Sequence, residues 1–270
     1  MTERSQEDLP RGAVSPASGP LLFARYAYPP NALGYCGPDD PQAMVRAAAA
    51  GEGNDALRAL VGRFDGASAY LALIAACNGV ADPLDRAVVE AYWVGNDLLQ
   101  QVPTGALSRC GPLAGLSGTR GARDDATWQG VAHHSFHVFA VYPWLALLRS
   151  GREQPALGVL DRCRIRWGCV EVVAGDAVTV RSRGLVFDRG NLLLGPNRVE
   201  HARLPPDGLG SARPVRPGDM VTLHWDWICD LLSASGLCWL RACTLQNLHA
   251  VNAAGCGQEG TPDRGCRGAR

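Results

Sequence analysis

The chain has 270 residues, 47% of them hydrophobic, and a formal net charge of zero. This length allows one large domain or two modest ones with a substantial core, and neutrality gives no electrostatic reason to expect nucleic acid or an acidic membrane surface as a partner. All 26 basic side chains are arginines, and the absence of lysine excludes Schiff-base catalysis on a lysine and a complete Walker-A phosphate loop.

The N-terminal segment and the cysteines indicate where the protein resides. Residues 1–20 are polar, contain proline and glycine and lack the apolar segment of a secretory signal, so they predict a disordered tail. Ten cysteines are scattered without a CxxC pair, which favours reduced thiols in the cytoplasm over a disulfide framework. The longest strongly apolar run, near Phe136–Leu148, contains Pro143 and is shorter than the roughly 20 residues of a membrane span. We therefore expect a cytoplasmic protein without a membrane span.

Residues 21–153 predict an α-helical domain. Strong helix formers dominate this part of the chain, and its apolar residues recur at helical spacing. Thr127–Leu148 is predicted to be one helix, kinked or restarted at Pro143 because proline lacks the N–H of a helix interior. Ser150–Pro155 is the expected linker to the second half of the chain.

Residues 157–253 predict a different kind of structure. Short β-branched runs alternate with turns of Gly, Asp, Asn and Pro, which is typical of strands. The last strand is expected at Met220–Trp225, and Asp226 can cap a helix that follows it. Residues 254–270 are rich in glycine and predict a flexible tail.

Two stretches of the second half carry the most distinctive pattern. DRCRIRWGCVEV begins at Asp161, and VRPGDMVTLHW ends at Trp225. Cys163 is expected to open the strand region and His224 to close it. A thiolate is a ligand for soft metals, and a nearby imidazole can add a second ligand or a hydrogen bond. The pair is therefore a candidate contact with a metal or a partner.

The surroundings of Cys163 allow two interpretations. Three arginines flank the thiol and could lower its pKa by favouring the anion: Arg162, Arg164 and Arg166. On a strand, however, Cys163 shares one face with Ile165 and Trp167, and such a face packs in a core. A buried cysteine is often a small hydrophobic side chain without a chemical role.

The order of these residues resembles the HypC/HupF hydrogenase-assembly chaperones over about residues 161–250. Cys163 matches the family cysteine, Gly168 the glycine of its Pro-Gly, Gly218-Asp219 its second Gly-Asp pair, and His224 its histidine. The resemblance implies a β-barrel that carries iron with cyanide and carbon monoxide ligands. It also implies delivery of that iron to the precursor of a nickel–iron hydrogenase large subunit.

The predicted fold class is therefore α+β, with an α-helical N-terminal domain followed by a small OB-like β-barrel and a C-terminal helix. Taken whole, the chain is also similar to an uncharacterised actinobacterial family of unknown function. The favoured hypothesis is a non-catalytic accessory protein for nickel–iron hydrogenase maturation. Cys163 and His224 would then contact the large-subunit precursor or the iron-loading machinery, and iron would be bound transiently.

A second candidate site is the cluster His133, His134 and His137 in the helical half. On a helix these residues stand three or four apart, so two of them can offer metal ligands from one face. The sequence is not HExxH, because His134 occupies the position of the glutamate base. A further ligand is left open among four residues: Cys36, Asp97, Asp124 and Asp125. The structural alternative is a hydrogen-bonded histidine network between helices.

The histidine cluster supports two rival functions. One is a metal-dependent enzyme in which His133, His134 and His137 hold a metal that activates water or oxygen. The other is a protein-interaction module without a metal, in which both groups of residues are structural. The sequence does not choose between them.

Overall fold

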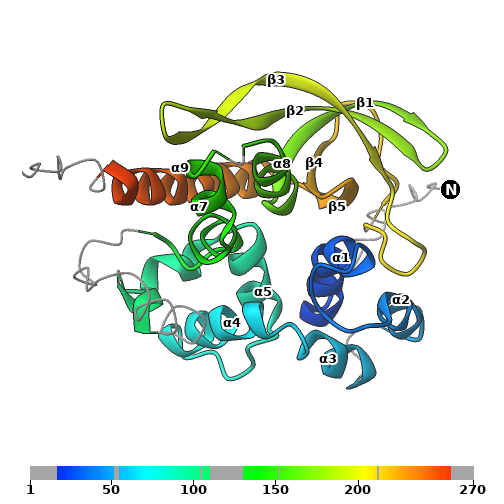
Figure 1. Ribbon diagram of the computed structural model, residues 1–270. Helices are drawn as coiled ribbons and strands as arrows, with labels where there is room; N and C mark the ends of the chain where they lie inside the picture. The colour runs from blue at the N-terminus through cyan, green and yellow to red at the C-terminus, as the bar shows by residue number, and fades with distance from the viewer. Residues whose placement is uncertain are drawn as a thin grey trace, which may run out of the picture.

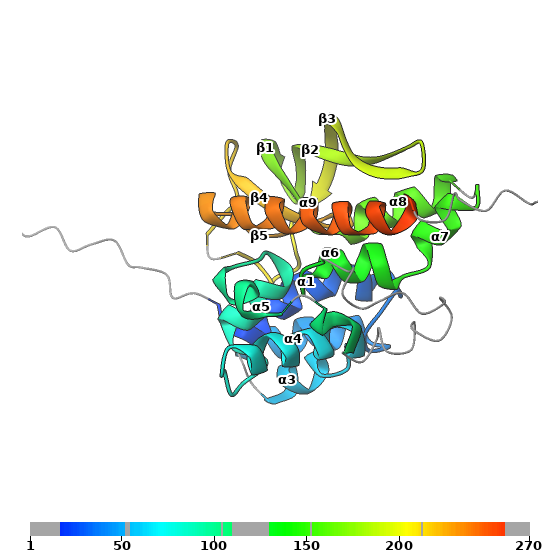
Figure 2. The same ribbon diagram turned by 90° about the vertical axis from the view of Figure 1, so that its left-hand side faces the viewer.

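The structure is a computed structural model that describes residues 17–51, 55–103, 105–109, 130–151, 153–211 and 213–256. It is an α+β molecule with helices and a five-stranded sheet. The strands form one layer, α1 to α5 lie on the opposite side, and α8 and α9 run between them (Figures 1 and 2).

The first half of the described chain is helical, as predicted. Its elements are α1 (Gly19–Ala32), α2 (Pro41–Ala49), α3 (Asp55–Val61), α4 (Asp65–Cys77), α5 (Arg86–Trp93) and two 3₁₀ turns, η1 (Asp97–Gln101) and η2 (Ala106–Arg109). Side-chain caps explain several of the starts. Ser18 accepts a hydrogen bond from the amide of Leu21, and Asp40 and Asp85 do the same for α2 and α5. Residues 17–20 of the expected tail are ordered, and residues 1–16 lie outside the described residues.

The segment with the three histidines is not one helix. It divides into α6 (His134–Phe136), a π-helical turn η5 (His137–Val141) and α7 (Trp144–Arg149), and the break before α7 falls at Pro143, as predicted. His133 precedes α6 as its N-cap. The expected start at Thr127 lies outside the described residues. A π-helical turn is rare and is often found at functional sites.

Helix α8 (Glu153–Cys163) begins inside the expected linker, Ser150–Pro155. Pro155 stands in its first turn, where a missing backbone N–H costs nothing. The prediction that Cys163 opens a strand is wrong, because Cys163 ends this helix and β1 begins at Arg166. The shared strand face of Cys163, Ile165 and Trp167 is therefore wrong as well.

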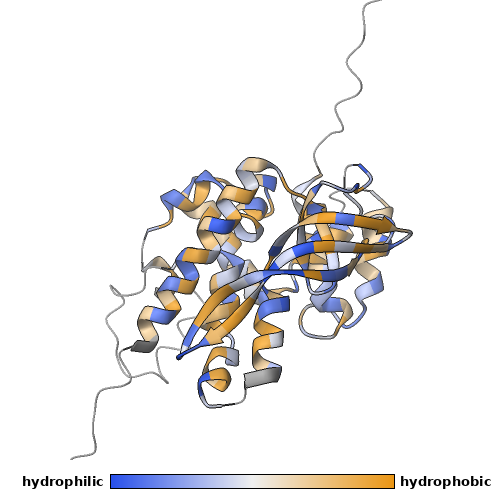
Figure 3. Ribbon diagram, turned by 90° about the horizontal axis from the view of Figure 1, so that it is seen from above, coloured by the Kyte–Doolittle hydropathy of each residue, from blue (hydrophilic) through white to orange (hydrophobic). Residues whose placement is uncertain are grey.

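Five strands follow: β1 (Arg166–Ala174), β2 (Ala177–Asp188), β3 (Asn191–Arg203), β4 (Met220–His224) and β5 (Trp227–Leu231). Their order is β1-β2-β3-β5-β4, and β4 pairs back onto β1. The joint between β3 and β5 is the single pair Arg203↔Trp227, so the sheet curls round without closing into a regular barrel. An OB-like fold is not confirmed. Hydrophilic and hydrophobic segments alternate along the strand ribbons, as expected for a sheet with one buried face (Figure 3).

The prediction of a helix capped by Asp226 is wrong. His224 pairs with Trp227, so Trp225 and Asp226 form a tight turn and the chain returns as β5. This pairing buries Ile228 against the residues of β4 in a small core inside the sheet. The C-terminal helix α9 (Ala234–Cys256) begins later, and most of the expected flexible tail, residues 257–270, lies outside the described residues.

The two halves share a core. The largest hydrophobic cluster contains Trp93 from the helical half and Trp225 and Cys229 from the sheet. Arg25 of α1 forms a salt bridge with Asp230 of β5 at 3.0 Å, between side chains that are both mostly buried. The site between the halves is therefore part of the folded core.

Among the described helices, none is by itself long and apolar enough to cross a membrane. The bent pair α3 and α4 meets the criterion together, by length and composition only.

Candidate functional site

The two sites predicted from the sequence meet in space. The ligand atoms of His134, Cys163 and His224 all lie within 4.8 Å of one another, and all three side chains are buried. His134 begins α6, Cys163 ends α8 and His224 ends β4. We call these three residues the Cys/His cluster. Their union depends on the packing of three elements that are far apart in the sequence.

His224 presents a free lone pair. Its Nδ1 lies 2.6 Å from the carbonyl oxygen of Tyr26, and because a carbonyl can only accept, Nδ1 carries the proton and donates. Nε2 is buried and has no hydrogen-bond partner among the described residues. Burial lowers the pKa of His224 to about 3, so the ring is neutral at pH 7. An imidazole fixed by a backbone carbonyl on one side and open on the other is the usual state of a metal-ligating histidine.

His134 is held from both sides. Its Nε2 donates to the carbonyl oxygen of Cys163 at 2.9 Å, and its Nδ1 lies 3.1 Å from the hydroxyl of Tyr92. Burial, together with the neighbouring His224 and His137, lowers the pKa of His134 well below its usual value. The neutral ring can bind a cation through Nε2 if it releases the Cys163 carbonyl and donates from Nδ1 to Tyr92.

Cys163 is a protonated thiol at neutral pH. Burial raises its pKa, and this effect outweighs the charge of Arg166, which acts in the opposite direction. The predicted lowering of the pKa by three arginines is therefore wrong. Arg164 hydrogen-bonds to Asp161, and the Arg162 guanidinium lies 5.6 Å from the centre of the Trp225 ring. A cation bound at the sulfur would displace the proton directly.

The sequence did not reveal how Cys163 and His224 are held together. The Arg166 guanidinium is buried and donates to the carbonyls of Asp161 and Arg162 at 3.2 Å each and to that of Trp225 at 2.6 Å. It thus ties the last turn of α8 to the turn after β4. Trp225 has a φ of 51°, which is strained for a bulky residue. Its backbone amide donates a hydrogen bond to the carbonyl oxygen of Arg162 at 2.8 Å.

The other two histidines have different roles. His133 caps α6, because its Nδ1 accepts a hydrogen bond from the amide of Ser135 at 3.0 Å. This places His133 outside the Cys/His cluster, which contains His134 but neither His133 nor His137. His137 lies beside the cluster, with its ring centre 6.3 Å from that of His134, and its Nδ1 has no partner among the described residues.

The glycines and aspartates proposed as supporting residues lie outside the Cys/His cluster. A Cβ at Gly168 would lie 2.4 Å from Val180 Cγ1, so this glycine permits close strand packing. Gly218 has a φ of 89° in a turn, and Asp219 after it forms a salt bridge with Arg213 at 2.7 Å. Asp226 is exposed in the turn between β4 and β5. These residues shape the sheet.

Of the four residues suggested as a further ligand, only Cys36 lies near the Cys/His cluster among the described residues. Cys36 lines the cavity described below, whereas Asp97 is exposed on η1. Asp124 and Asp125 lie outside the described residues.

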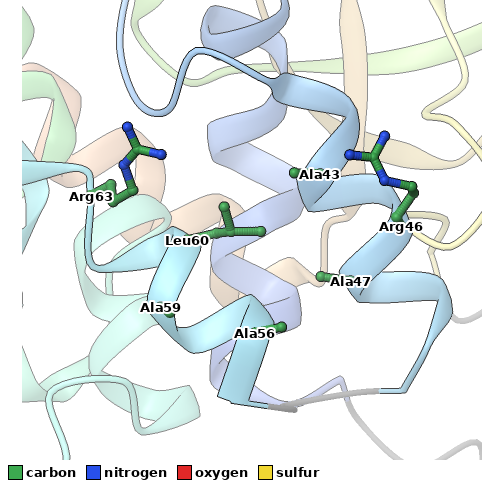
Figure 4. Close-up of a pocket in the computed structure, with 7 residues that line it drawn as sticks. All are labelled: Ala43, Arg46, Ala47, Ala56, Ala59, Leu60 and Arg63. Atoms are coloured by element: carbon green, nitrogen blue, oxygen red, sulfur yellow. The ribbon is translucent and has the colours of Figure 1, made fainter.

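The Cys/His cluster lines a cavity of about 460 Å³ between the helices and the sheet, together with Cys36, His137 and Tyr142. Aromatic rings form much of its wall: Phe23, Phe64, Trp93, Trp144 and Trp225. The volume falls within the range of about 300–1,000 Å³ that is usual for small-molecule sites. A surface groove of about 480 Å³ between α2 and α3 is lined by alanines, Leu60, Arg46 and Arg63 and contains no histidine or cysteine (Figure 4). The cavity is therefore the candidate site.

The fold and the site define an α+β protein with a buried group of histidines and a cysteine beside an aromatic-walled cavity. The chain belongs to the family described as "Family of unknown function (DUF6390)", which matches residues 15–258. No curated protein and no solved structure matches the chain. The expectation of a family of unknown function is confirmed, and nothing in these comparisons supports the HypC/HupF resemblance.

Proposed function

We propose that this protein binds a transition-metal ion through Cys163 Sγ, His224 Nε2 and His134, and that the metal faces a small molecule in the cavity. The observation that carries the proposal is the mutual separation of no more than 4.8 Å between the three ligand atoms. A sulfur and two imidazole nitrogens suit Zn²⁺, and they also suit iron and copper. Three protein ligands leave a position open, which is typical of catalytic sites and not of structural ones.

The fit can be tested against bond lengths. Zn–S bonds of about 2.3 Å and Zn–N bonds of about 2.0–2.1 Å imply ligand separations of about 3.3–3.6 Å around a tetrahedral ion. The Cys/His cluster, with atoms up to 4.8 Å apart, would have to contract by about 1 Å. The main cost is the hydrogen bond from His134 to the Cys163 carbonyl, which a metal at Nε2 replaces.

Titration of the reduced full-length protein with Co²⁺ tests the site. A thiolate ligand gives a charge-transfer absorption band, and we expect this band at one equivalent, with loss on addition of Zn²⁺. Cys163→Ala should abolish the band, and His224→Ala should abolish or strongly shift it. Cys243→Ala is the matched control, because Cys243 is equally buried but lies on α9 away from the cavity. An intact band in Cys163→Ala, or no band in the wild type, would contradict the proposal.

Two earlier hypotheses share this metal chemistry. The buried position favours a resident metal in an enzyme-like cavity, because a thiol that is 7% exposed is poorly placed to pass iron to another protein. Hydrogenase maturation, with transient iron carrying diatomic ligands and the large-subunit precursor as partner, stays a separate proposal. Its test is an infrared spectrum of protein purified anaerobically from its native host. Cyanide and carbonyl bands that vanish in Cys163→Ala would favour it over the resident metal.

A further inference from the structure

We propose that the mouth of this cavity binds the carboxylate of a small monocarboxylic acid with an apolar, ring-bearing body. The body would extend inward along the aromatic wall toward the Cys/His cluster. The inference rests on the proposed function for the ligand's role beside the metal. Binding of the carboxylate rests on the mouth alone and can be measured without a metal.

Arg63, just before the N-cap of α4, and Asp65 and Gly66 in its first turn all line the cavity, and we call these three residues the mouth. Arg63 is exposed and forms no ion pair with any described residue. The N-cap of α4 is Phe64, whose side chain cannot accept a hydrogen bond from the first-turn amides. Free amides at a helix N-terminus attract anions. The cation and the open helix end therefore stand together.

A buried histidine supplies a second, independent indication of a ligand. His137 is 6% exposed, and its Nδ1 has no hydrogen-bond partner among the described residues. A Cβ at Gly66 would lie 3.0 Å from His137 Cε1 and 3.1 Å from its Nε2, so the ring packs directly on the first turn of α4. Burial lowers the pKa of His137 to about 4, which leaves one N–H on a neutral ring to donate. A buried polar ring without a partner is expected to have one when the site is filled.

Other groups at the mouth narrow the class of ligand. Asp65 also lines the cavity, and its carboxylate disfavours a second negative charge, so phosphate esters and dicarboxylates fit less well than a monocarboxylate. The phenol rings of Tyr70 and Tyr142 flank His137, at ring-centre distances of 5.6 and 4.6 Å. Deeper in, the wall is aromatic, which favours a ring over a flexible polar chain.

The test uses 3-phenylpropanoate and its neutral amide as probes of the full-length protein. Calorimetric titration should show the acid binding about tenfold more tightly than the amide. Arg63→Gln should remove this preference, and Asp65→Asn should increase it. Arg46→Gln is the matched control. Arg46 lines the groove between α2 and α3 with Arg63 (Figure 4), but it is paired with Asp40 at 2.6 Å and does not line the cavity.

Each outcome bears on the proposal. Equal affinities for the two probes, no binding of either, or an unchanged preference in Arg63→Gln would overturn it. A preference that is lost equally in Arg46→Gln would also overturn it, because the effect would then be general surface charge. The same titrations on metal-free and Zn²⁺-loaded protein separate the two proposals. If the Co²⁺ titration fails, the preference for the acid over the amide should still be measurable. If that preference is absent, the cobalt band should still appear.

Discussion

The two sides of the last turn of α8 both bury polar groups, but they differ in how those groups are paired. On one side is an ionic network of Asp161, Arg164, Arg198 and Glu200, in which Asp161 accepts hydrogen bonds from two arginines and from the amide of Leu185. On the other side is the Cys/His cluster, where His224 Nε2 has no partner among the described residues. In the ionic network, Arg164 Nη1 also has no partner among the described residues, but its carboxylate partner is present. Removing one partner of a buried ion pair is costly, whereas a buried group without a partner needs a separate explanation, and a bound ligand is the one proposed for the Cys/His cluster.

Acidification should lower the free energy of unfolding through the buried histidines, and this is the largest change that we expect. Burial lowers the pKa of His133 and His224 to about 3 and that of His137 to about 4. Below the unfolded value of about 6.5, the unfolded chain takes up protons that the folded chain does not, so the free energy of unfolding falls as pH decreases. At pH 5 the loss is roughly 2 kcal/mol for each of these histidines.

Urea unfolding of metal-free protein between pH 7.5 and pH 5 measures this loss. His137→Gln should reduce the total loss of unfolding free energy between pH 7.5 and pH 5 by about 2 kcal/mol, and the exposed control His201→Gln should leave it unchanged. The ionic network should not contribute in this window. Burial alone would raise the pKa of Asp161, but Arg164, Arg166 and Arg198 together hold it below its usual value. A flat profile down to pH 5 would show that the histidines are hydrated in solution.

Asp161→Ala should cause the next largest loss in the free energy of unfolding. It leaves the fully buried Arg164 without its carboxylate, and loss of one partner from a buried ion pair costs about 3–5 kcal/mol. Chemical denaturation at pH 7 measures the difference. The control is Arg46→Ala, which breaks an exposed pair with Asp40 and should cost less than about 1 kcal/mol. Similar losses in the two variants would mean that the network is solvated and that the comparison does not hold.

The contrast also shows which parts of the fold the sequence could predict. Strands after residue 157 were predictable because alternating β-branched residues and turn residues are local signals. The helix ending at Cys163 was missed because Pro155 suggested a linker, although a first-turn proline is compatible with a helix. The strand β5 was missed because Asp226 looks like a helix cap, and only pairing with β4 shows that it lies in a turn.

The site followed the same rule. Cys163, His134 and His224 were each candidates from the sequence, but their meeting depends on contacts between three distant elements. His133 was left open between a metal ligand and a hydrogen-bonded structural histidine, and its cap on α6 could not be predicted because a histidine cap gives no strong pattern before a short helix. Arg63 and Gly66 carried no local signal, and Trp225 was expected only as the end of the last strand, because the roles of all three arise from the cavity that the fold creates.

The smallest expected effect is stabilisation by Zn²⁺, which should depend on the Cys/His cluster and not on the ionic network. Zn²⁺ at about 100 times its dissociation constant should raise the free energy of unfolding by about 2.7 kcal/mol. Cys163→Ala should remove this increment. Arg198→Gln removes a contact of Asp161 from the ionic network and should lower stability while leaving the increment intact, because separate sites contribute additively. Denaturation with and without Zn²⁺ gives all three values. An increment that shrinks in Arg198→Gln would show that the ionic network sets the position of Cys163, and that the paired and unpaired sides of α8 act as one unit.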